Sequence, residues 1–168
     1  MAVMTAAGDV GHSGRDEIVR HFTWTDLDLV LAHARGGVEQ AWQALEAVDT
    51  AATFQSRSFL STWALTAAEP SGETLLYVVA HREGRPVFVL PLAMTRFLGA
   101  RVLTWAAQSH ANYGLGLFHP ELIADFSRGA RDIDDLIHTV AREVGADIVH
   151  LENQPTQWAG LPNPFAGS

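Results

Sequence analysis

Two apolar runs that flank a short polar turn form the strongest pattern in the sequence. Residues 75–80 and 87–92 are rich in leucine, aromatic and β-branched residues, and Glu83-Gly84 lies between them. Because glycine adopts positive φ freely, this pattern is typical of an antiparallel hairpin with a two-residue loop. Neither run alternates between apolar and polar residues, so both faces of the hairpin are predicted to be covered.

Two prolines in the second run bear on the register of this hairpin. A two-residue loop places Ala80 opposite Val87 and Leu76 opposite Pro91. Pro86 and Pro91 lie at an odd spacing, so in a regular ladder their missing N–H groups would point to opposite sides of the strand. We expect the strand to bulge or to leave the ladder near Pro91, beside a binding cleft. The alternative is that the ladder simply ends there.

Apolar residues at helical spacing predict three helices. The first covers residues 38–48. The second covers residues 56–67, with Ser56 as its N-cap, and ends before Pro70. The third covers residues 133–144, where Asp132 can cap the start and Gly145 stops the helix.

The remaining patterns predict strands and one loop. Strands are expected over residues 21–33 and 101–106, the latter antiparallel to the hairpin, and a buried strand over 146–151. Residues 108–118 indicate a loop that enters a short strand, because two glycines and a His-Ala-Asn-Tyr sequence interrupt any period. Together these elements predict an α/β fold of the α+β-like kind, with a mainly antiparallel sheet flanked by helices.

Composition narrows the class of protein. Of the 168 residues, 48% are apolar and 18% are charged, which fits one compact domain. The net charge of −8 argues against nucleic acid or an anionic membrane as the main partner. The chain has no cysteine, which excludes disulfides, thiolate nucleophiles and cysteine-based metal sites. No secretory signal and no long apolar run are present, so we expect a cytoplasmic protein without membrane insertion.

Several short segments give the sequence a family resemblance. They are Trp42-Gln43-Ala44-Leu45, Thr53-Phe54-Gln55-Ser56, Trp63, the hairpin 78–92, Gly99-Ala100-Arg101-Val102-Leu103, Asn112-Tyr113 and Asp147-Ile148-Val149-His150-Leu151. In these segments the sequence resembles the N-terminal half of the CelD/BcsL family of GNAT-like acetyltransferases, which is associated with bacterial cellulose biosynthesis. The resemblance spans roughly residues 38–165.

The resemblance implies a GNAT-like mixed sheet and a division of the chain. Residues 1–20 are expected to be a mobile N-terminus, and residues 21–152 an N-terminal half-domain. Residues 153–168 are expected to be a tail or linker toward a second half, which in the family is the half expected to hold acetyl coenzyme A. The apolar side chains of this tail either pack back on the sheet or meet a following segment.

The sequence offers two approximations to the pyrophosphate loop of a GNAT enzyme, which requires Arg/Gln-x-x-Gly-x-Gly/Ala directly before a helix. Residues 96–101 run into a predicted strand, and residues 157–162 end in a proline with no helix behind them. Neither supplies the geometry. We therefore expect acetyl coenzyme A as co-substrate only at the level of the family, with no cofactor-binding residues recognisable in this chain.

Acyl transfer requires a base near the acceptor and a donor for the developing oxyanion. His110, Asn112 and Tyr113 share the irregular loop, where His110 could act as a base, Asn112 could donate to a carbonyl and Tyr113 could bind or protonate. The alternative is that Tyr113 packs on the sheet edge while His110 and Asn112 satisfy loop backbone groups. The positions of His81, His110 and His150 fit no metal motif, so no metal is expected.

These observations predict the acceptor-side half of a GNAT-like N- or O-acyltransferase that is incomplete as an enzyme by itself. Its partners would be a small-molecule or saccharide acceptor and a second GNAT half or another copy of the chain. Two alternatives stay open: a non-catalytic binding or assembly module, and a truncated remnant.

Overall fold

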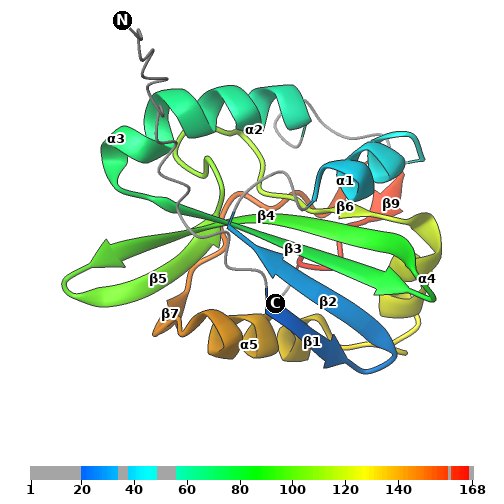
Figure 1. Cartoon of the computed structure of the whole chain (residues 1–168). Coiled ribbons are helices and arrows are strands. Elements are labelled where there is room, and N and C mark those ends of the chain that lie inside the picture. Colours follow the sequence, from blue (N-terminus) through cyan, green and yellow to red (C-terminus); the bar gives the residue numbers. More distant parts are fainter. Residues whose placement is uncertain (1–19, 34–37, 49–55, 159, 167–168) are drawn as a thin grey trace, which may run out of the picture.

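The computed structural model describes residues 20–33, 38–48, 56–158 and 160–166, and these form a curled sheet with helices on both faces (Figure 1). The strands are β1 (Arg20–Trp24), β2 (Leu27–Ala32), β3 (Thr74–Arg82), β4 (Arg85–Phe97), β5 (Ala100–Trp105), β6 (Leu117–Phe118), β7 (Ile148–Val149), β8 (Gln157–Trp158) and β9 (Leu161–Pro162). The helices are α1 (Glu39–Glu46), α2 (Arg57–Trp63), which continues as a π-helical turn (Ala64–Ala68) into α3 (Glu69–Ser71), α4 (Pro120–Ser127) and α5 (Ile133–Val144).

The main sheet has the order β1-β2-β3-β4-β5-β7, and β6 pairs with β4 beside β5. All these pairs are antiparallel except β5 and β7, which are parallel. The parallel pair requires a crossover, and α5 lies within it. The prediction of a mixed, mainly antiparallel sheet flanked by helices is therefore confirmed.

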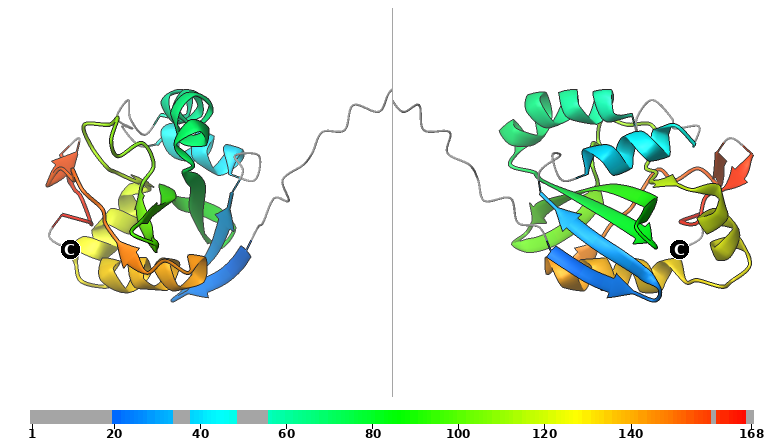
Figure 2. Two further views of the ribbon diagram at one scale, coloured as in Figure 1. Left: turned by 90° about the vertical axis from the view of Figure 1, so that its left-hand side faces the viewer. Right: turned by 45° about the vertical axis from the view of Figure 1, so that its right-hand side comes forward.

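Two apolar cores lie on the two faces of this sheet. Trp42 of α1 and Trp63 of α2 pack with Tyr77 and Val79 on one face. On the other face, α4 and α5 cover a larger cluster that includes Val78 of β3. Figure 2 shows the α1 and α2 pair on one side of the strands and α5 on the other. The predicted covering of both faces of the hairpin is confirmed, because alternate residues of β3 enter different cores.

The predicted helix signals are largely confirmed. The Ser56 side chain accepts from the Phe59 N–H, the Asp132 side chain accepts from the Asp134 N–H, and Gly145 ends α5 at φ 69°. The predicted end of the second helix before Pro70 is wrong, because helical structure continues through Ser71. Pro70 is the middle residue of the three-residue α3, at the C-terminal end of this continuous helical segment.

The single strand predicted over residues 21–33 is two strands. β1 and β2 form a hairpin around Thr25 and Asp26, and Thr25 has φ 55°. Arg131 donates to the side chains of both turn residues and so holds the turn from outside the hairpin. The turn was not predicted because it contains neither glycine nor proline.

Two further elements differ from prediction. α4 was not predicted, although His119 caps it and Pro120 occupies its first position. The strand expected over residues 146–151 is shorter, since β7 covers Ile148–Val149, and it is not buried: Ile148 is 46% exposed.

The central hairpin has the predicted two-residue loop and a different register. Arg82 pairs with Arg85, as a Glu83-Gly84 loop requires, but the register shifts between Ala80 and His81, so that Ala80 pairs with Phe88. Val87 is the extra residue of this bulge. The expected bulge near Pro91 in this ladder is wrong. The pairing of β3 and β4 is regular through Pro91. One bulge anywhere between Pro86 and Pro91 is enough to let both proline nitrogens face the same side of β4, and the bulge at Val87 does this.

The interruption near Pro91 occurs on the opposite edge of β4. There β6 pairs with Phe88 and Val89, whereas β5 pairs from Leu92 onward. The Pro91 carbonyl accepts from the Ala106 N–H at 3.0 Å, so the proline nitrogen, which has no hydrogen, faces this edge. The chain leaves the sheet here and returns as β6. Residues 106–116 connect β5 to β6, and we call this connection the edge loop.

The described part of the C-terminal tail packs back on the domain. Phe165 is 1% exposed, and its ring lies 5.1 Å from that of Trp105 and 6.0 Å from that of Phe118. Residues 1–19, predicted to be mobile together with residue 20, and residues 53–55 of the family resemblance lie outside the described residues. Among the helices of the described residues, none is long and apolar enough to cross a membrane.

Candidate functional site

The edge loop contains the three predicted site residues and is fixed at its base by two glycines. A Cβ atom on Gly114 would lie 2.2 Å from Cδ1 of Trp105, and one on Gly116 would lie 2.5 Å from Cδ2 of Leu90. Glycine is therefore required at both positions to let the loop backbone approach the sheet. The Gly114 N–H also donates to the Asn153 carbonyl at 3.0 Å, which ties the loop to the chain that follows β7.

His110 is held by a tryptophan on α2. Trp63 Nε1 donates to His110 Nδ1 at 3.2 Å, and the Ser109 hydroxyl lies 2.9 Å from the same nitrogen. An indole N–H can only donate, so Nδ1 carries the lone pair and the neutral ring carries its proton on Nε2. The outward nitrogen of the exposed His110 ring is then an N–H donor. The predicted role of His110 as a base does not suit this tautomer.

Asn112 and Tyr113 follow His110 on the exposed side of the loop. Tyr113 is 40% exposed, and Asn112 is exposed as well. The loop therefore brings together an imidazole N–H, a carboxamide and a phenol at the surface. These groups bind hydroxyl-rich ligands well, because each forms directional hydrogen bonds and the phenol ring offers an apolar face.

Gln108 joins the edge loop to the strand pair β5 and β7. Its Oε1 atom lies 3.4 Å from the backbone nitrogens of both Trp105 and Glu152, beyond the point where the parallel ladder ends. The side-chain amide thus spans the gap between the diverging chains. Neither Gln108 nor the polar role of Trp63 was predicted from the sequence, although the indole N–H of a buried tryptophan usually has a partner.

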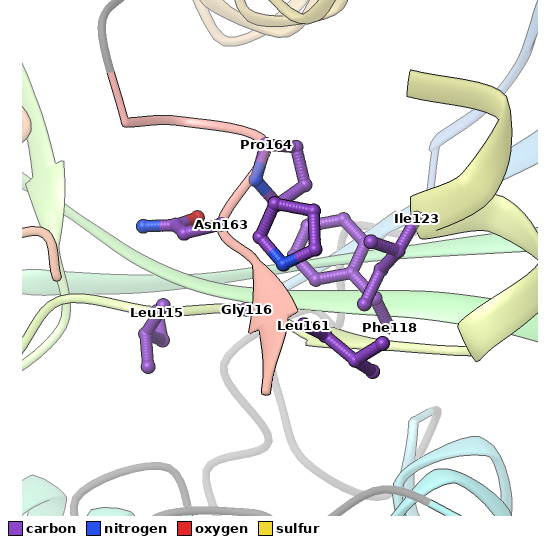
Figure 3. A pocket seen from close by; sticks show the side chains of 8 residues that line it. Leu115, Gly116, Phe118, Ile123, Leu161, Asn163 and Pro164 are labelled. Atoms are coloured by element: carbon purple, nitrogen blue, oxygen red, sulfur yellow. The ribbon is translucent and has the colours of Figure 1, made fainter. Parts of the chain in front are cut away.

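A small cavity lies beside the base of the edge loop. It has a volume of about 30 Å³ and is lined by Leu115, Gly116, Phe118, Ile123 and residues 161–164 (Figure 3). This volume corresponds to about two or three water molecules. The cavity is too small for a substrate, and neither His110, Asn112 nor Tyr113 lines it.

The two segments with approximate pyrophosphate motifs do not have the geometry that acetyl coenzyme A requires. Residues 96–101 are the paired strand ends and the two-residue turn of the β4–β5 hairpin, and residues 157–162 include the paired strands β8 and β9. Neither precedes a helix, so no positive helix end faces these backbone N–H groups.

The N-termini of α1, α2, α4 and α5 do not fit a pyrophosphate either. In α1, Glu39 places a negative charge in the first turn. The first turn of α5 carries Asp134 and Asp135, and Asp135 accepts from Trp24 Nε1 at 2.7 Å. In α4, Pro120 lacks an N–H and the Glu121 N–H faces His119 Nδ1. In α2, the Arg57 N–H donates to the Glu46 carboxylate at 2.8 Å. At some of these helix ends the N–H groups that a phosphate would need already have hydrogen-bond partners. At the others, acidic side chains would repel the phosphate.

A network of charges at the other end of the sheet was not predicted. Arg82 donates to Asp125 at 2.6 Å, Arg131 lies 3.5 Å from the same carboxylate, and Arg131 also pairs with Asp26. The hydrogen bond from Arg82 holds the pKa of Asp125 below its ordinary value, although burial acts in the opposite direction. The network links the β1–β2 turn and the β3–β4 turn to α4 and to the segment between α4 and α5. This position indicates a structural role.

No group of three or more His, Cys, Asp or Glu side chains placed to hold a metal ion occurs in the described segments. The chain matches no protein-family model, no curated protein and no solved structure. The resemblance to the CelD/BcsL family therefore stays a prediction from the sequence.

Proposed function

We propose that this chain is the acceptor-side half of a GNAT-like acyltransferase, and that the edge loop binds a saccharide acceptor. The observation that carries the proposal is the composition of the loop surface, where His110 offers an N–H, Asn112 a carboxamide and Tyr113 a half-exposed phenol ring. A sugar hydroxyl can accept from the imidazole and exchange hydrogen bonds with the amide, while its ring packs on an aromatic face.

The sheet topology supports the GNAT-like part of the proposal. Antiparallel strands joined by hairpins are followed by a helix and a parallel strand, β7, and two helices lie between β2 and β3. This is the mixed, mainly antiparallel arrangement that the resemblance implies. Because one fold can serve many activities, the topology supports the fold part of the proposal and the loop supports the function.

The misfit of a pyrophosphate group supports assignment to the acceptor side. In this proposal, acyl coenzyme A binds to a second half, and this chain orients the acceptor. Since His110 presents a donor toward the surface, its role here is to bind the acceptor and hold it in place. The base that removes the acceptor proton would then come from outside this loop.

Isothermal titration calorimetry with acetyl coenzyme A tests the assignment to the acceptor side. We expect no saturable heat with this chain alone, because its helix N-termini are occupied by its own side chains. Micromolar binding would overturn the assignment. The positive control is a saccharide titration followed by NMR, in which the loop amides of residues 108–113 are expected to shift.

A non-catalytic assembly module is the second candidate, and the tip of the β4–β5 hairpin favours it. Leu98 is 94% exposed and Phe97 is 65% exposed, and both lie at the end of a hairpin that projects from the sheet (Figure 1). Exposed apolar pairs of this kind are typical of contact sites. Sedimentation velocity of the chain and of Leu98→Asn tests this surface, since a module that pairs with itself through the hairpin tip predicts a mass that rises with concentration and falls back in the variant. A fully monomeric chain contradicts pairing with itself.

A further inference from the structure

A second pocket lies on the sheet face covered by α5, whereas His110 contacts Trp63 on the face covered by α2. The pocket has a volume of about 150 Å³, which corresponds to roughly ten water molecules. It is lined by Arg20, Leu31, His33, Thr74, Leu76, Met94, Glu143 and Val144. A cavity of this size accommodates a small organic molecule.

Strand register explains why these side chains meet. Leu31 pairs with Arg20 in the β1–β2 ladder, and Thr74 pairs with Met94 in the β3–β4 ladder. Directly paired residues share a sheet face, and so do residues two apart on one strand. Leu76 therefore lies on the same face as Thr74. The C-terminal turn of α5 closes the pocket from the other side.

The floor of the pocket is apolar. Leu31 is 2% exposed and Leu76 is 1% exposed, and Met94 and Val144 are partly buried beside them. The aliphatic part of a ligand gains free energy when its own apolar surface leaves water and lies against this floor.

The rim of the pocket carries one positive and one negative side chain. Arg20 Nη1 donates to the Glu143 carbonyl at 2.9 Å, so Arg20 covers the C-terminal end of α5 and keeps further N–H donors for a ligand. Within the described ranges, no ion pair involves the Glu143 carboxylate. Both charges are therefore available to a ligand that carries both signs.

His33 contributes an acceptor. Its Nδ1 atom lies 3.3 Å from the Leu75 carbonyl oxygen, and a carbonyl can only accept, so Nδ1 carries the hydrogen. In the neutral ring, Nε2 then carries the lone pair, which is the reverse of the tautomer found for His110. His33 can accept a hydrogen bond from an ammonium group.

We propose that this pocket binds a free aliphatic α-amino acid of about the size of leucine. Arg20 binds the carboxylate, Glu143 and His33 Nε2 accept from the ammonium group, and the side chain covers Leu31 and Leu76. A zwitterion is the chemical class that uses the positive and the negative charge of the rim at once. The site is separate from the edge loop and does not depend on the proposed acyl transfer.

Three ligands of similar shape test the proposal by ¹H–¹⁵N NMR titration of the whole chain. L-leucine carries both charges, 4-methylpentanoate (leucine without its amino group) carries the carboxylate, and isopentylamine (leucine without its carboxyl group) carries the ammonium group. We expect leucine to shift the amide signals around the pocket in a saturable way, and each singly charged ligand to bind at least about tenfold more weakly. Absence of saturable shifts with leucine, or equal affinity for 4-methylpentanoate or isopentylamine, would overturn the proposal.

Variants of the rim test the assigned contacts. Arg20→Gln and Glu143→Gln remove one charge each from side chains that are not fully buried, and each is expected to weaken leucine binding by about tenfold or more. Arg85→Gln is the matched control, because Arg85 is an exposed arginine at the β3–β4 turn, away from the pocket lining. Unchanged leucine affinity in both rim variants would contradict the site even where the chain binds leucine elsewhere.

Discussion

Trp63 Nε1 donates a hydrogen bond to His110 Nδ1 at 3.2 Å. This bond connects α2 with the edge loop, two segments that lie 47 residues apart in the sequence. Because the indole can only donate, the bond fixes which nitrogen of His110 carries the proton. The chemistry of the loop surface thus depends on a tryptophan whose hydrogen bond was not predicted from the sequence.

Replacement of Trp63 by phenylalanine is expected to release the His110 tautomer. In the unchanged chain above neutral pH, we expect ¹⁵N shifts of the imidazole that report a proton on Nε2. In Trp63→Phe, the tautomer with the proton on Nδ1 should gain population, because the Ser109 hydroxyl that remains 2.9 Å from Nδ1 can donate or accept, whereas the indole can only donate. The Trp42→Phe variant serves as a control for a lost indole in the same core. An unchanged chain with the proton on Nδ1 would contradict the hydrogen bond.

Asp125 is expected to contribute stability that depends on pH. Its pKa is held below the ordinary value of 3.8, mainly by the hydrogen bond from Arg82. A carboxylate with a lowered pKa in the folded state contributes stability above the pKa of the unfolded state, and this contribution disappears as the pH falls through the folded-state pKa. At pH 7, Asp125→Asn is therefore expected to lower the free energy of unfolding by about 1–3 kcal/mol.

The measurement for Asp125 is urea unfolding of both proteins between pH 7 and the lowest pH at which they fold. The difference between them should shrink below about pH 4. Asp28→Asn is the matched control, since Asp28 is an exposed carboxylate on β2, and it should change stability by less than about 0.5 kcal/mol. A difference for Asp125→Asn that stays constant with pH would contradict the ion pair.

Gly114 is expected to tolerate no side chain. In Gly114→Ala, the new Cβ would meet the buried Trp105 ring at 2.2 Å, so the edge loop must move away from the sheet. We expect a loss of about 1–3 kcal/mol in the free energy of unfolding, and a change in the fluorescence of Trp105. Gly129→Ala is a useful comparison, because a Cβ there meets nothing within 4 Å and only its φ of 69° opposes the change. Gly114 itself has no positive φ, so a loss in Gly114→Ala of less than about 0.5 kcal/mol would contradict the ring contact.

Leu98 is expected to lower the free energy of unfolding, because leucine is unfavourable in the backbone conformation of this turn. It has φ 50° in the two-residue turn before Gly99, a position that favours asparagine, and its side chain is 94% exposed. Leu98→Asn should raise the free energy of unfolding by about 1 kcal/mol in chemical denaturation. Glu83→Asn, at φ 52° in the corresponding turn, should give a similar gain. A loss in Leu98→Asn alone would contradict this account, and reduced self-association in that variant alone would support the assembly module.

Local signals allowed much of the fold to be predicted. The helix ends at Ser56, Asp132 and Gly145 were predicted correctly. Each depends on one local feature, which is a capping side chain or a glycine with positive φ. The turn at Thr25 was missed because a contact from Arg131, distant in sequence, helps to hold it. Such a contact leaves no local pattern.

The central hairpin shows how much the odd spacing of two prolines can predict about a strand. The odd spacing of Pro86 and Pro91 requires one irregularity between them, but sequence does not say where it lies. The structure places it at Val87, next to the turn, and Pro91 instead marks where β4 changes partners from β6 to β5. The predicted bulge of the hairpin ladder near Pro91, and the cleft expected beside it, are therefore not supported, and the change of partners on the other edge of β4 was not predicted.

Only part of the candidate site could be predicted from the sequence. The loop position of His110, Asn112 and Tyr113 followed from the broken period. The tautomer of His110 did not, because it depends on Trp63 across the fold. The pocket beside α5 also depends on register, which brings residues from the four strands of two hairpins, β1–β2 and β3–β4, to one face.

The most direct test of the central claim is a ¹H–¹⁵N NMR titration of the chain with cellotetraose, a saccharide chosen because of the family resemblance. The account predicts saturable shifts at the amides of residues 108–113, and their loss in Tyr113→Ala, with the signals of the α5 pocket unchanged. If cellotetraose leaves the loop amides unchanged, or if the Tyr113→Ala variant binds it equally well, the edge loop is not the saccharide site.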